Sequence, residues 1–364
     1  MFKLAILADI SSPHTIKWLN ALSNNNIEIL LISLGNKEVN LNISNVSILS
    51  FNKTNKQDNF IKRIKLKFDY IKYVLSIKRK IRAFNPDILH SHYATSYGLL
   101  GSLMNIKPYV ISVWGSDVTS FPKKSFLHKI LIKYNFSKAN YICATGNSLK
   151  KETIIYTSKN VHVIPFGIDV SRFSPRMKEL SKQVTIGSVK YFDKIYGLDI
   201  LIKAFSLLVK DKRLNVDIKL LLIGDGEEKQ NYIDMINSEG ISERVEFAGF
   251  INNDLLLEEY HKMDIVVIPS LRESFGLSVL EAMSCEIPVI ASNISGFREV
   301  GNDETITYFD AGNIEMLAKN IFDVINAYDL ALVKAKKARQ RVIDNFSSDY
   351  CVNMQMNLYK QILK

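Results

Sequence analysis

The most informative stretch of the chain reads Pro269-Ser-Leu-Arg-Glu-Ser-Phe-Gly-Leu-Ser-Val-Leu-Glu-Ala-Met-Ser-Cys-Glu-Ile-Pro-Val-Ile-Ala-Ser292. An apolar run typical of a buried strand leads into it, and its pattern predicts a polar loop and then a helix that begins near Phe275-Gly276-Leu277. Glycine at this place lets an anion approach the free N–H groups of the first helical turn, where the macrodipole favours negative charge. The stretch therefore predicts an anion site between a strand and a helix.

Two carboxylates accompany this site. Glu273 precedes the predicted helix and Glu281 lies within it. Carboxylates so placed can accept hydrogen bonds from sugar hydroxyls, as an acidic residue does for ribose in dinucleotide-binding proteins. They can also be a helix cap and a buried glutamate paired with a base, and the spacing alone favours this second interpretation.

The rest of the chain alternates short β-rich runs with longer helical stretches, which indicates doubly wound parallel α/β sheets. We expect strands at Lys3–Ala8, Ile27–Ser33, Ile88–His90, Tyr109–Val113, Tyr141–Ala144, Val161–Ile164, Val184–Val189, Ile218–Ile223, Val245–Ala248, Ile265–Pro269 and Pro288–Ala291. Helix candidates in the first half are Thr15–Ser23, Phe60–Phe84 and Phe126–Phe136. The pattern pauses at Pro165–Pro175, which suits a linker.

The length of 364 residues favours two domains. We expect an N-terminal domain at residues 1–170, a C-terminal domain at 171–345 and a final helix at 346–364 that packs back on the first domain. Ligands of such sheets bind beyond the carboxyl ends of the strands. The loops expected there carry polar residues and glycines: Gly115-Ser116-Asp117, Gly187-Ser188, Gly224-Asp225-Gly226, Gly249-Phe250 and Ser270–Gly276.

The net charge of +10 suggests an anionic partner. Most of the excess lies between Lys53 and Arg82, where lysines and arginines alternate with apolar residues at roughly helical spacing. Such a helix can lie on an anionic membrane surface, or it can pack on its own domain with solvated lysines. A second basic and apolar stretch runs from Lys123 to Lys138. Nucleic acid is a weaker interpretation, because no zinc-finger spacing or RNA-binding signature accompanies the charge.

The cysteines and the apolar runs indicate the cellular compartment in which we expect the protein. Cys143, Cys285 and Cys351 are odd in number and lack metal-ligand spacing, which predicts a reduced, cytoplasmic protein. No apolar run is long enough to span a bilayer, and Leu4–Ala8 is too short for a signal-peptide core. A peripheral position at the inner face of the cell membrane stays open.

The stretch at Pro269–Ser292 closely resembles the E-x7-E signature of retaining glycosyltransferase family 4. Glu273 and Glu281 match its two glutamates, and Phe275-Gly276-Leu277 matches its phosphate-contacting turn. Further matches follow in order at Ala282-Met283, Pro288-Val289, Gly296 and Glu299, and earlier at Leu220–Gly226, Val245–Phe250 and Pro165–Pro175. The resemblance implies the GT-B fold, two doubly wound Rossmann-like α/β domains facing a central cleft.

The resemblance also assigns roles to residues. Glu281 is expected to hold the ribose hydroxyls of the donor, Glu273 to contact the transferred sugar, and Lys190 with Lys194 to neutralise the diphosphate. The catalytic set is expected to be Glu273, Lys194 and Asp117. Further donor-binding residues are expected at Gly187, Ser188, Gly249, Phe250, Ser274, Phe275, Gly276 and Leu277, and acceptor-binding residues at His14, Trp114 and His92.

The chain departs from the family pattern at several positions. Trp114 stands where histidine is common, Glu286 where glycine is usual, Lys190 where arginine is usual, and His14 where many members carry a glycine pair. His90 and His92 have no third ligand nearby in the sequence and are expected to be core and cleft-edge residues. No D-x-D motif occurs, so we expect a reaction that uses no metal and no cofactor, with a nucleotide sugar, most often of UDP, as co-substrate.

The expected function is retaining transfer of a sugar from a nucleotide-sugar donor to a glycan acceptor, without a protein nucleophile. The basic first domain suggests a lipid-linked acceptor at a membrane, as in bacterial surface polysaccharide synthesis, whether capsule or lipopolysaccharide. Two alternatives stay open: a nucleotide-sugar epimerase of the same architecture, and a non-catalytic nucleotide-sugar-binding protein.

Overall fold

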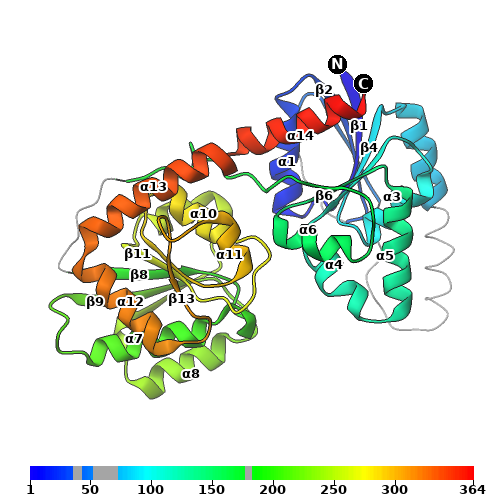
Figure 1. The fold of residues 1–364 in the computed structure, drawn as a ribbon. Helices are drawn as coiled ribbons and strands as arrows, with labels where there is room; N and C mark the ends of the chain where they lie inside the picture. The colour runs from blue at the N-terminus through cyan, green and yellow to red at the C-terminus, as the bar shows by residue number, and fades with distance from the viewer. Residues whose placement is uncertain (36–42, 52–72, 177–182) are drawn as a thin grey trace. The chain divides into compact units, whose positions relative to one another are not determined.

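The computed structural model describes residues 1–35, 43–51, 73–176 and 183–364, and the chain divides into two compact units (Figure 1). Unit 1 comprises Met1–Phe166 together with Cys351–Lys364, and unit 2 comprises Gly167–Tyr350. The chain therefore leaves unit 1 within the predicted linker and returns to it in its last helix.

Unit 1 is built on a parallel sheet with the strand order β3-β2-β1-β4-β5-β6-β7. Its strands are β1 (Phe2–Leu7), β2 (Ile27–Ser33), β3 (Val46–Ser50), β4 (Ile88–His92), β5 (Tyr109–Val113), β6 (Tyr141–Ala144) and β7 (Val161–Val163). The order reverses between β1 and β4, so the loops that follow these two strands diverge and leave room for a ligand.

The helices of unit 1 are α1 (Pro13–Ser23), a helix at residues 73–84, α3 (Ser96–Met104), α4 (Ser116–Thr119), α5 (Phe126–Lys138) and α6 (Asn147–Ile154). The last helix, α14 (Ser348–Ile362), begins in unit 2 and continues into unit 1. Within unit 1 its Tyr359 packs edge-on against Phe2 of β1, with ring centroids 5.9 Å apart.

Unit 2 repeats the same plan with the strand order β10-β9-β8-β11-β12-β13, all parallel. Its strands are β8 (Gln183–Val189), β9 (Asp217–Ile223), β10 (Val245–Gly249), β11 (Ile265–Ile268), β12 (Val289–Ser292) and β13 (Thr307–Phe309). Its helices are α7 (Leu198–Lys210), α8 (Lys229–Glu239), α9 (Leu256–Tyr260), α10 (Leu277–Ser284), α11 (Ser295–Val300), α12 (Ile314–Asn326) and α13 (Tyr328–Phe346). The order reverses between β8 and β11, so the loops after these strands form the switch point.

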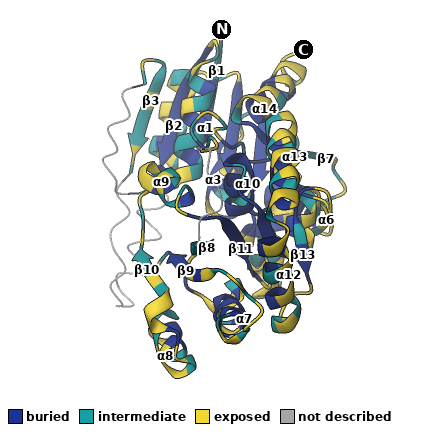
Figure 2. Cartoon of the chain, turned by 90° about the vertical axis from the view of Figure 1, so that its left-hand side faces the viewer, coloured by how far each residue is buried: buried dark blue, intermediate teal, exposed yellow. Residues whose placement is uncertain are grey.

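The central strands are buried on both faces, as parallel strands covered by helices must be (Figure 2). Every residue of β11 is fully buried, and all five residues of β4 are buried although two of them are histidines. The predicted fold class, two doubly wound α/β domains, is confirmed.

The sequence missed two edge strands, β3 and β13. β3 is only partly buried and β13 has three residues, so neither has the long apolar run that marks an inner strand. Of the basic helix expected at Phe60–Phe84, only residues 73–84 are described; these are helical, with Ile77 and Ile81 buried, and the rest of the basic stretch lies outside the described residues. No helix in the described part of the chain could cross a membrane.

Candidate active site

The carboxyl edge of the sheet in unit 2 is a set of loops joined by backbone hydrogen bonds. The N–H of Lys190 donates to the carbonyl of Ile223 (3.0 Å), and the N–H of Leu271 donates to the carbonyl of Ile195 (2.9 Å). Gly224, with φ +142°, lies so close to the Lys190 carbonyl that any side chain there would overlap it. The loops that follow β8, β9 and β11 thus form one connected platform.

This platform brings Lys190 and Glu273 together. Lys190 Nζ lies 2.5 Å from Glu273 Oε2, and the two side chains are only 9% and 19% exposed. Glu273 Oε1 also accepts the N–H of Ser274 at 3.2 Å. Lys190 Nζ lies 5.0 Å from the ring centre of Tyr196, whose pKa is raised by burial and by the Glu273 charge. The two residues expected at the diphosphate and at the sugar are therefore one ion pair in this structure.

Two glycines shape the backbone around Glu273. Gly276, with φ +91°, is the residue before α10 and adopts a conformation that side chains rarely take. Gly296 of α11 faces the Glu273 peptide, where an added Cβ would lie 2.4 Å from the Glu273 carbonyl oxygen. Close approach of α11 to this loop thus requires glycine at position 296.

Glu281 lies on α10 and is 7% exposed. The hydroxyl of Tyr260 donates to Glu281 Oε2 at 3.0 Å, and burial together with the Glu281 charge raises the pKa of Tyr260 well above its usual value. A charged Glu281 also contributes, after burial, to raising the pKa of Cys285 to about 12. Tyr260 was not predicted from the sequence, because a tyrosine in a short helix carries no signal of the carboxylate that it meets.

The other predicted donor residues are differently placed. Lys194 is 81% exposed and lies 3.8 Å from Glu228, so it is free to swing toward an anion. Gly187 lies inside β8, and the Met263 side chain fills the space where a Cβ would be, so the glycine is required by packing. Ser188 is buried, and its hydroxyl has no partner among the described residues.

The remaining predicted donor-binding residues lie at the end of β10 and in the segment that follows β11. Gly249 has φ +72°, and the side chain of Phe250 after it is 80% exposed. Phe275 is buried against Phe346, with ring centroids 6.0 Å apart. Phe275 can therefore contact a ligand through its backbone only, whereas Ser274 and Leu277 are half-buried.

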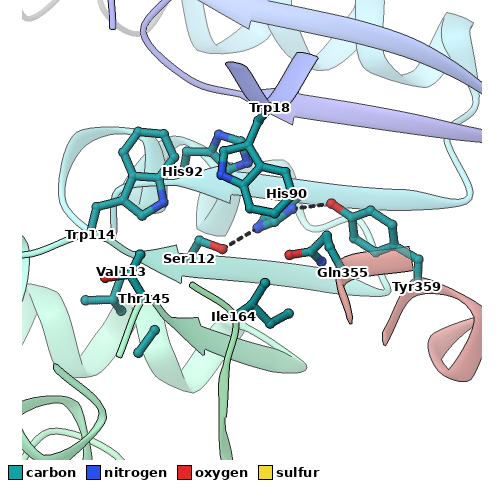
Figure 3. Close-up of a pocket in the computed structure, with 11 residues that line it drawn as sticks. Trp18, His90, His92, Ser112, Val113, Trp114, Thr145, Ile164, Gln355 and Tyr359 are labelled. Carbon is teal, nitrogen blue, oxygen red and sulfur yellow. Dashed lines mark hydrogen bonds between the residues drawn. The ribbon is translucent and has the colours of Figure 1, made fainter. Parts of the chain in front are cut away.

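In unit 1 the three residues expected to bind acceptor come together. The ring of His14 stacks on Phe166 at 4.4 Å and meets Trp114 edge-on at 5.9 Å. The ring of His92 lies 4.8 Å from that of Trp114 (Figure 3). His14 lies at the start of α1, which follows β1, and His92 is the last residue of β4. The sheet order reverses between these two strands.

These histidines are uncharged near neutral pH. Burial, with a smaller contribution from Lys17, lowers the pKa of His14 to about 4, and burial lowers that of His92 to about 3. His90, on the same strand, is buried with its pKa well below the usual value. His90 Nδ1 lies 2.6 Å from the Tyr359 hydroxyl and Nε2 lies 2.8 Å from that of Ser112, so it is a core residue as expected.

The structure places Asp117, a predicted catalytic residue, in α4, the short helix after β5. This side chain is completely buried and accepts backbone N–H groups from Ala94 (2.9 Å), Gly115 (2.8 Å) and Trp114 (3.2 Å). These hydrogen bonds join the loop after β5 to the backbone after β4. The catalytic role of Asp117 remains a prediction.

Glu286 and the possible metal ligands were also subjects of the sequence analysis. Glu286, where glycine is usual, has φ +56° and lies 3.7 Å from Arg339, so a charged residue occupies the left-handed conformation that the glycine would adopt. In the described part of the chain, no three His, Cys, Asp or Glu side chains gather as metal ligands. The expectation of a metal-independent reaction remains a prediction.

Comparison with known families decides the class. A model described as "Glycosyl transferases group 1" matches residues 171–341, and one described as "Glycosyl transferase 4-like" matches residues 3–146. The chain is a family 4-type glycosyltransferase. Glu273, Glu281 and Lys190 lie in the first matched segment, whereas His14, His92 and Trp114 lie in the second.

Relatives of this glycosyltransferase match between half and about four fifths of its length. N-acetyl-alpha-D-glucosaminyl L-malate synthase of Bacillus anthracis is 27% identical over 82% of this chain and 81% of that protein. The capsular polysaccharide biosynthesis glycosyltransferase CapM of Staphylococcus aureus is 28% identical over 66% of this chain and 60% of its own. The O-antigen biosynthesis glycosyltransferase WclY of Escherichia coli is 31% identical over 50% of this chain and 48% of its own.

Solved structures agree on the fold of the glycosyltransferase. Sucrose-phosphate synthase from Thermosynechococcus elongatus superposes with a TM-score of 0.83 at 18% identity, covering 100% of this chain and 99% of its own. HepE of Anabaena, in complex with UDP and glucose, superposes with a TM-score of 0.77 at 17% identity, covering 99% of this chain and 100% of its own. The predicted GT-B fold is confirmed.

Proposed function

We propose that this glycosyltransferase takes a sugar from a nucleotide-sugar donor bound at the carboxyl edge of unit 2. The observation that carries the proposal is the half-buried pair of Lys190 and Glu273 on a platform that also holds the buried Glu281. Structures of HepE contain UDP, UDP with glucose, and UDP-glucose. We therefore expect a UDP-sugar as donor, with a GDP-sugar as the second choice.

The charges of the site suit such a donor. A diphosphate that binds near Lys190 can share its ammonium group with Glu273, and Lys194 can approach from solvent to add a second positive charge. These two lysines stabilise the negative charge that develops on the leaving nucleoside diphosphate. Glu273, which stays paired with Lys190, accepts hydrogen bonds from the hydroxyls of the sugar, and Glu281 accepts hydrogen bonds from those of ribose.

We propose transfer with retention of the anomeric configuration and without a protein nucleophile. Glu273 is bound to Lys190 and to the Ser274 N–H, so its charge is already satisfied and it is a poor nucleophile. In the proposed reaction the acceptor hydroxyl attacks the face from which the diphosphate leaves, and a leaving phosphate oxygen takes its proton. Proton NMR of the first-formed product tests this step, because an inverted anomer would contradict it.

The proposal is tested by release of nucleoside diphosphate from a panel of UDP- and GDP-sugars, with water as acceptor. We expect Glu273→Ala and Lys194→Ala to lower the rate by about 100-fold or more, and the exposed Glu258→Ala to leave it unchanged. Lys194→Ala should alter the free energy of unfolding by less than about 0.5 kcal/mol, since this side chain is exposed. Activity of Glu273→Ala near that of the wild type, or conversion of the donor to an epimer, would contradict the proposal.

The acceptor belongs to the same proposal. CapM and WclY are named for capsular polysaccharide and O-antigen biosynthesis, and we propose a glycan acceptor of this kind, linked to a lipid. The cluster of His14, Trp114 and His92 supports an acceptor role for unit 1, because aromatic and uncharged imidazole rings suit the apolar faces and hydroxyls of a sugar.

A lipid-linked acceptor requires contact with a membrane, and α5 offers a suitable surface. Phe126 and Leu127 are 75% and 74% exposed, and Ile130 and Tyr134 on the same helix are also exposed. The helix and the turn before it carry five lysines and no acidic residue: Lys123, Lys124, Lys129, Lys133 and Lys138. Exposed Ile154 and Ile155 share a groove with Lys133, which extends the same surface. Apolar side chains surrounded by lysines suit an anionic lipid surface.

Flotation of the full chain with vesicles of phosphatidylcholine and phosphatidylglycerol tests this surface. We expect binding at low salt that weakens at high salt, and at least a ~10-fold loss of binding when Phe126 and Leu127 are both changed to serine. Leu330→Ser with Val333→Ser, an exposed apolar pair on α13, is the control. Equal binding by the two double variants would contradict the assignment.

A further inference from the structure

A small cavity lies in unit 1 between the ends of the central strands and the last helix (Figure 3). His92 of β4, Thr145 after β6 and Gln355 of α14 line it, together with both tryptophans of the chain, Trp18 and Trp114. Its volume for the centre of a water molecule is about 10 Å³, which is enough for about one water.

Three of the residues that line this cavity each carry a buried polar atom with no hydrogen-bond partner among the described residues. These atoms are His92 Nδ1, Thr145 Oγ1 and Gln355 Nε2, on side chains that are 2–3% exposed. A buried polar atom left without a partner destabilises the folded state, because its lost hydrogen bonds to water are not replaced. Because the three residues line one cavity, a single polar ligand placed there can bond to all three atoms.

The chemistry of the three atoms identifies the ligand. An amide nitrogen only donates, a hydroxyl donates and accepts, and an uncharged imidazole nitrogen accepts or donates according to its tautomer. One water offers two donors and two acceptors, and buried waters typically make about three hydrogen bonds. The small volume suits a single water.

We propose that one ordered water occupies this cavity and that, through it, Gln355 and Thr145 position His92 against Trp114. A second contact from the same helix supports this arrangement: Tyr359 of α14 holds His90, whose ring meets that of His92 at 4.7 Å. Gln355 and Tyr359 are thus positioning residues, and α14 supports the wall formed by His14, His92 and Trp114. That this wall receives the acceptor rests on the function proposed above, whereas the water and its contacts do not.

The alternative is a packing defect in which Gln355 has no effect on His92. Gln355→Met keeps the length of the side chain and removes its amide, and Thr145→Val keeps the shape and removes the hydroxyl. Gln361→Met makes the same chemical change at an exposed position of α14 and is the matched control. Histidine-labelled full-length protein is examined by long-range ¹H–¹⁵N correlation, which reports the tautomer and hydrogen bonding of each ring, and His92→Asn assigns the His92 signals.

We expect one defined tautomer for His92 in the wild type, a changed Nδ1 signal in Gln355→Met and Thr145→Val, and a wild-type spectrum in Gln361→Met. A crystal structure of the wild-type chain should show one water within about 3.2 Å of all three atoms. A dry cavity, or His92 signals unchanged in both cavity variants, would overturn the proposal. Release of UDP from UDP-glucose, measured in parallel, reports the donor reaction alone, so its failure contradicts the proposed function and leaves the spectra interpretable.

Discussion

The position of Glu273 depends on a neighbour that has no side chain. Gly296 faces the Glu273 carbonyl, and an alanine there would place its Cβ 2.4 Å from that oxygen. We expect Gly296→Ala to displace the loop, to lower the free energy of unfolding by about 1–3 kcal/mol, and to reduce nucleoside diphosphate release by about 100-fold.

Gly240→Ala is the control for this change. Gly240 has φ +70°, and a Cβ added there would have no atom within 4 Å. Alanine at this position therefore strains the backbone by about 1–2 kcal/mol without contacting the donor site. A comparable loss of stability with normal activity is expected. If the two alanine variants had equal activity, Gly296 would have no role in placing Glu273.

A second prediction concerns the partner of Glu281. Tyr260→Phe removes the hydroxyl that donates to Glu281 Oε2 and should lower the free energy of unfolding by about 1.5–3 kcal/mol. We expect KM for the donor to rise by roughly 10-fold with kcat less affected, because the carboxylate loses its fixed orientation. Tyr232→Phe removes a buried hydroxyl that has no partner among the described residues, and steady-state kinetics should show no change. A donor KM equal to that of the wild type in Tyr260→Phe would refute this role.

At the level of single residues, the structure brings together two residues that the family resemblance assigned to one site. Lys190 and Glu273 are far apart in the chain but were both predicted at the donor, and the structure joins them in one ion pair. Asp117 was predicted as catalytic, and its carboxylate accepts hydrogen bonds from the backbone N–H groups of Ala94 and Gly115. A sequence does not show whether a polar side chain faces a ligand or its own loop, because that depends on packing.

Strand β4 makes unit 1 sensitive to acid. Its His90 and His92 are buried and uncharged, with the pKa of His92 lowered to about 3 and that of His90 well below normal. Histidines in the unfolded chain have a pKa near 6.5. Below this pH the unfolded chain therefore binds protons at positions 90 and 92, whereas the folded chain does not. Stability is therefore greatest above pH 6.5 and falls as the pH drops toward 3.

The expected size of this effect is about 2 kcal/mol per ring between pH 7 and pH 5. Both tryptophans lie in unit 1, so tryptophan fluorescence during denaturation follows that unit alone. His14 in unit 1 also has a lowered pKa, so His92→Asn should remove roughly one third of the dependence of the unfolding free energy on pH in this window. A dependence as steep as that of the wild type would show that His92 does not contribute.

At the level of elements, the bounds of the inner strands were predicted to within a few residues. This was possible because a strand that is buried on both faces needs a continuous apolar run. β3 and β13 at the sheet edges lack such runs and were missed. His14, Trp114 and His92 were predicted as acceptor-binding residues and lie together in unit 1, whereas their neighbours Phe166, Gln355 and Tyr359 were not predicted. The last two lie on α14, nearly two hundred residues after the first part of unit 1 ends. A final helix at 346–364 was expected to pack back on the first domain, but its sequence does not indicate which of its side chains meet His90 and His92.

For the whole molecule, alternating strands and helices were sufficient to predict two doubly wound units. Their family membership is shown by matches to both halves of the chain. The excess of positive charge is partly explained by α5, whose lysines surround exposed apolar side chains, while most of the basic stretch at Lys53–Arg82 lies outside the described residues. Charge and exposure together suggest a membrane surface, and neither identifies the acceptor.

The central claim is that unit 2 alone holds the nucleotide through Lys190, Glu273 and Glu281. Calorimetric titration of the full chain with UDP, and separately with GDP, tests it most directly. We predict that one of the two nucleotides binds, that Glu281→Ala and Lys190→Ala each weaken its binding by about 10-fold or more, and that His14→Ala in unit 1 leaves it unchanged. Binding of neither nucleotide, or equal affinity in the wild type and the Glu281→Ala variant, would contradict the account.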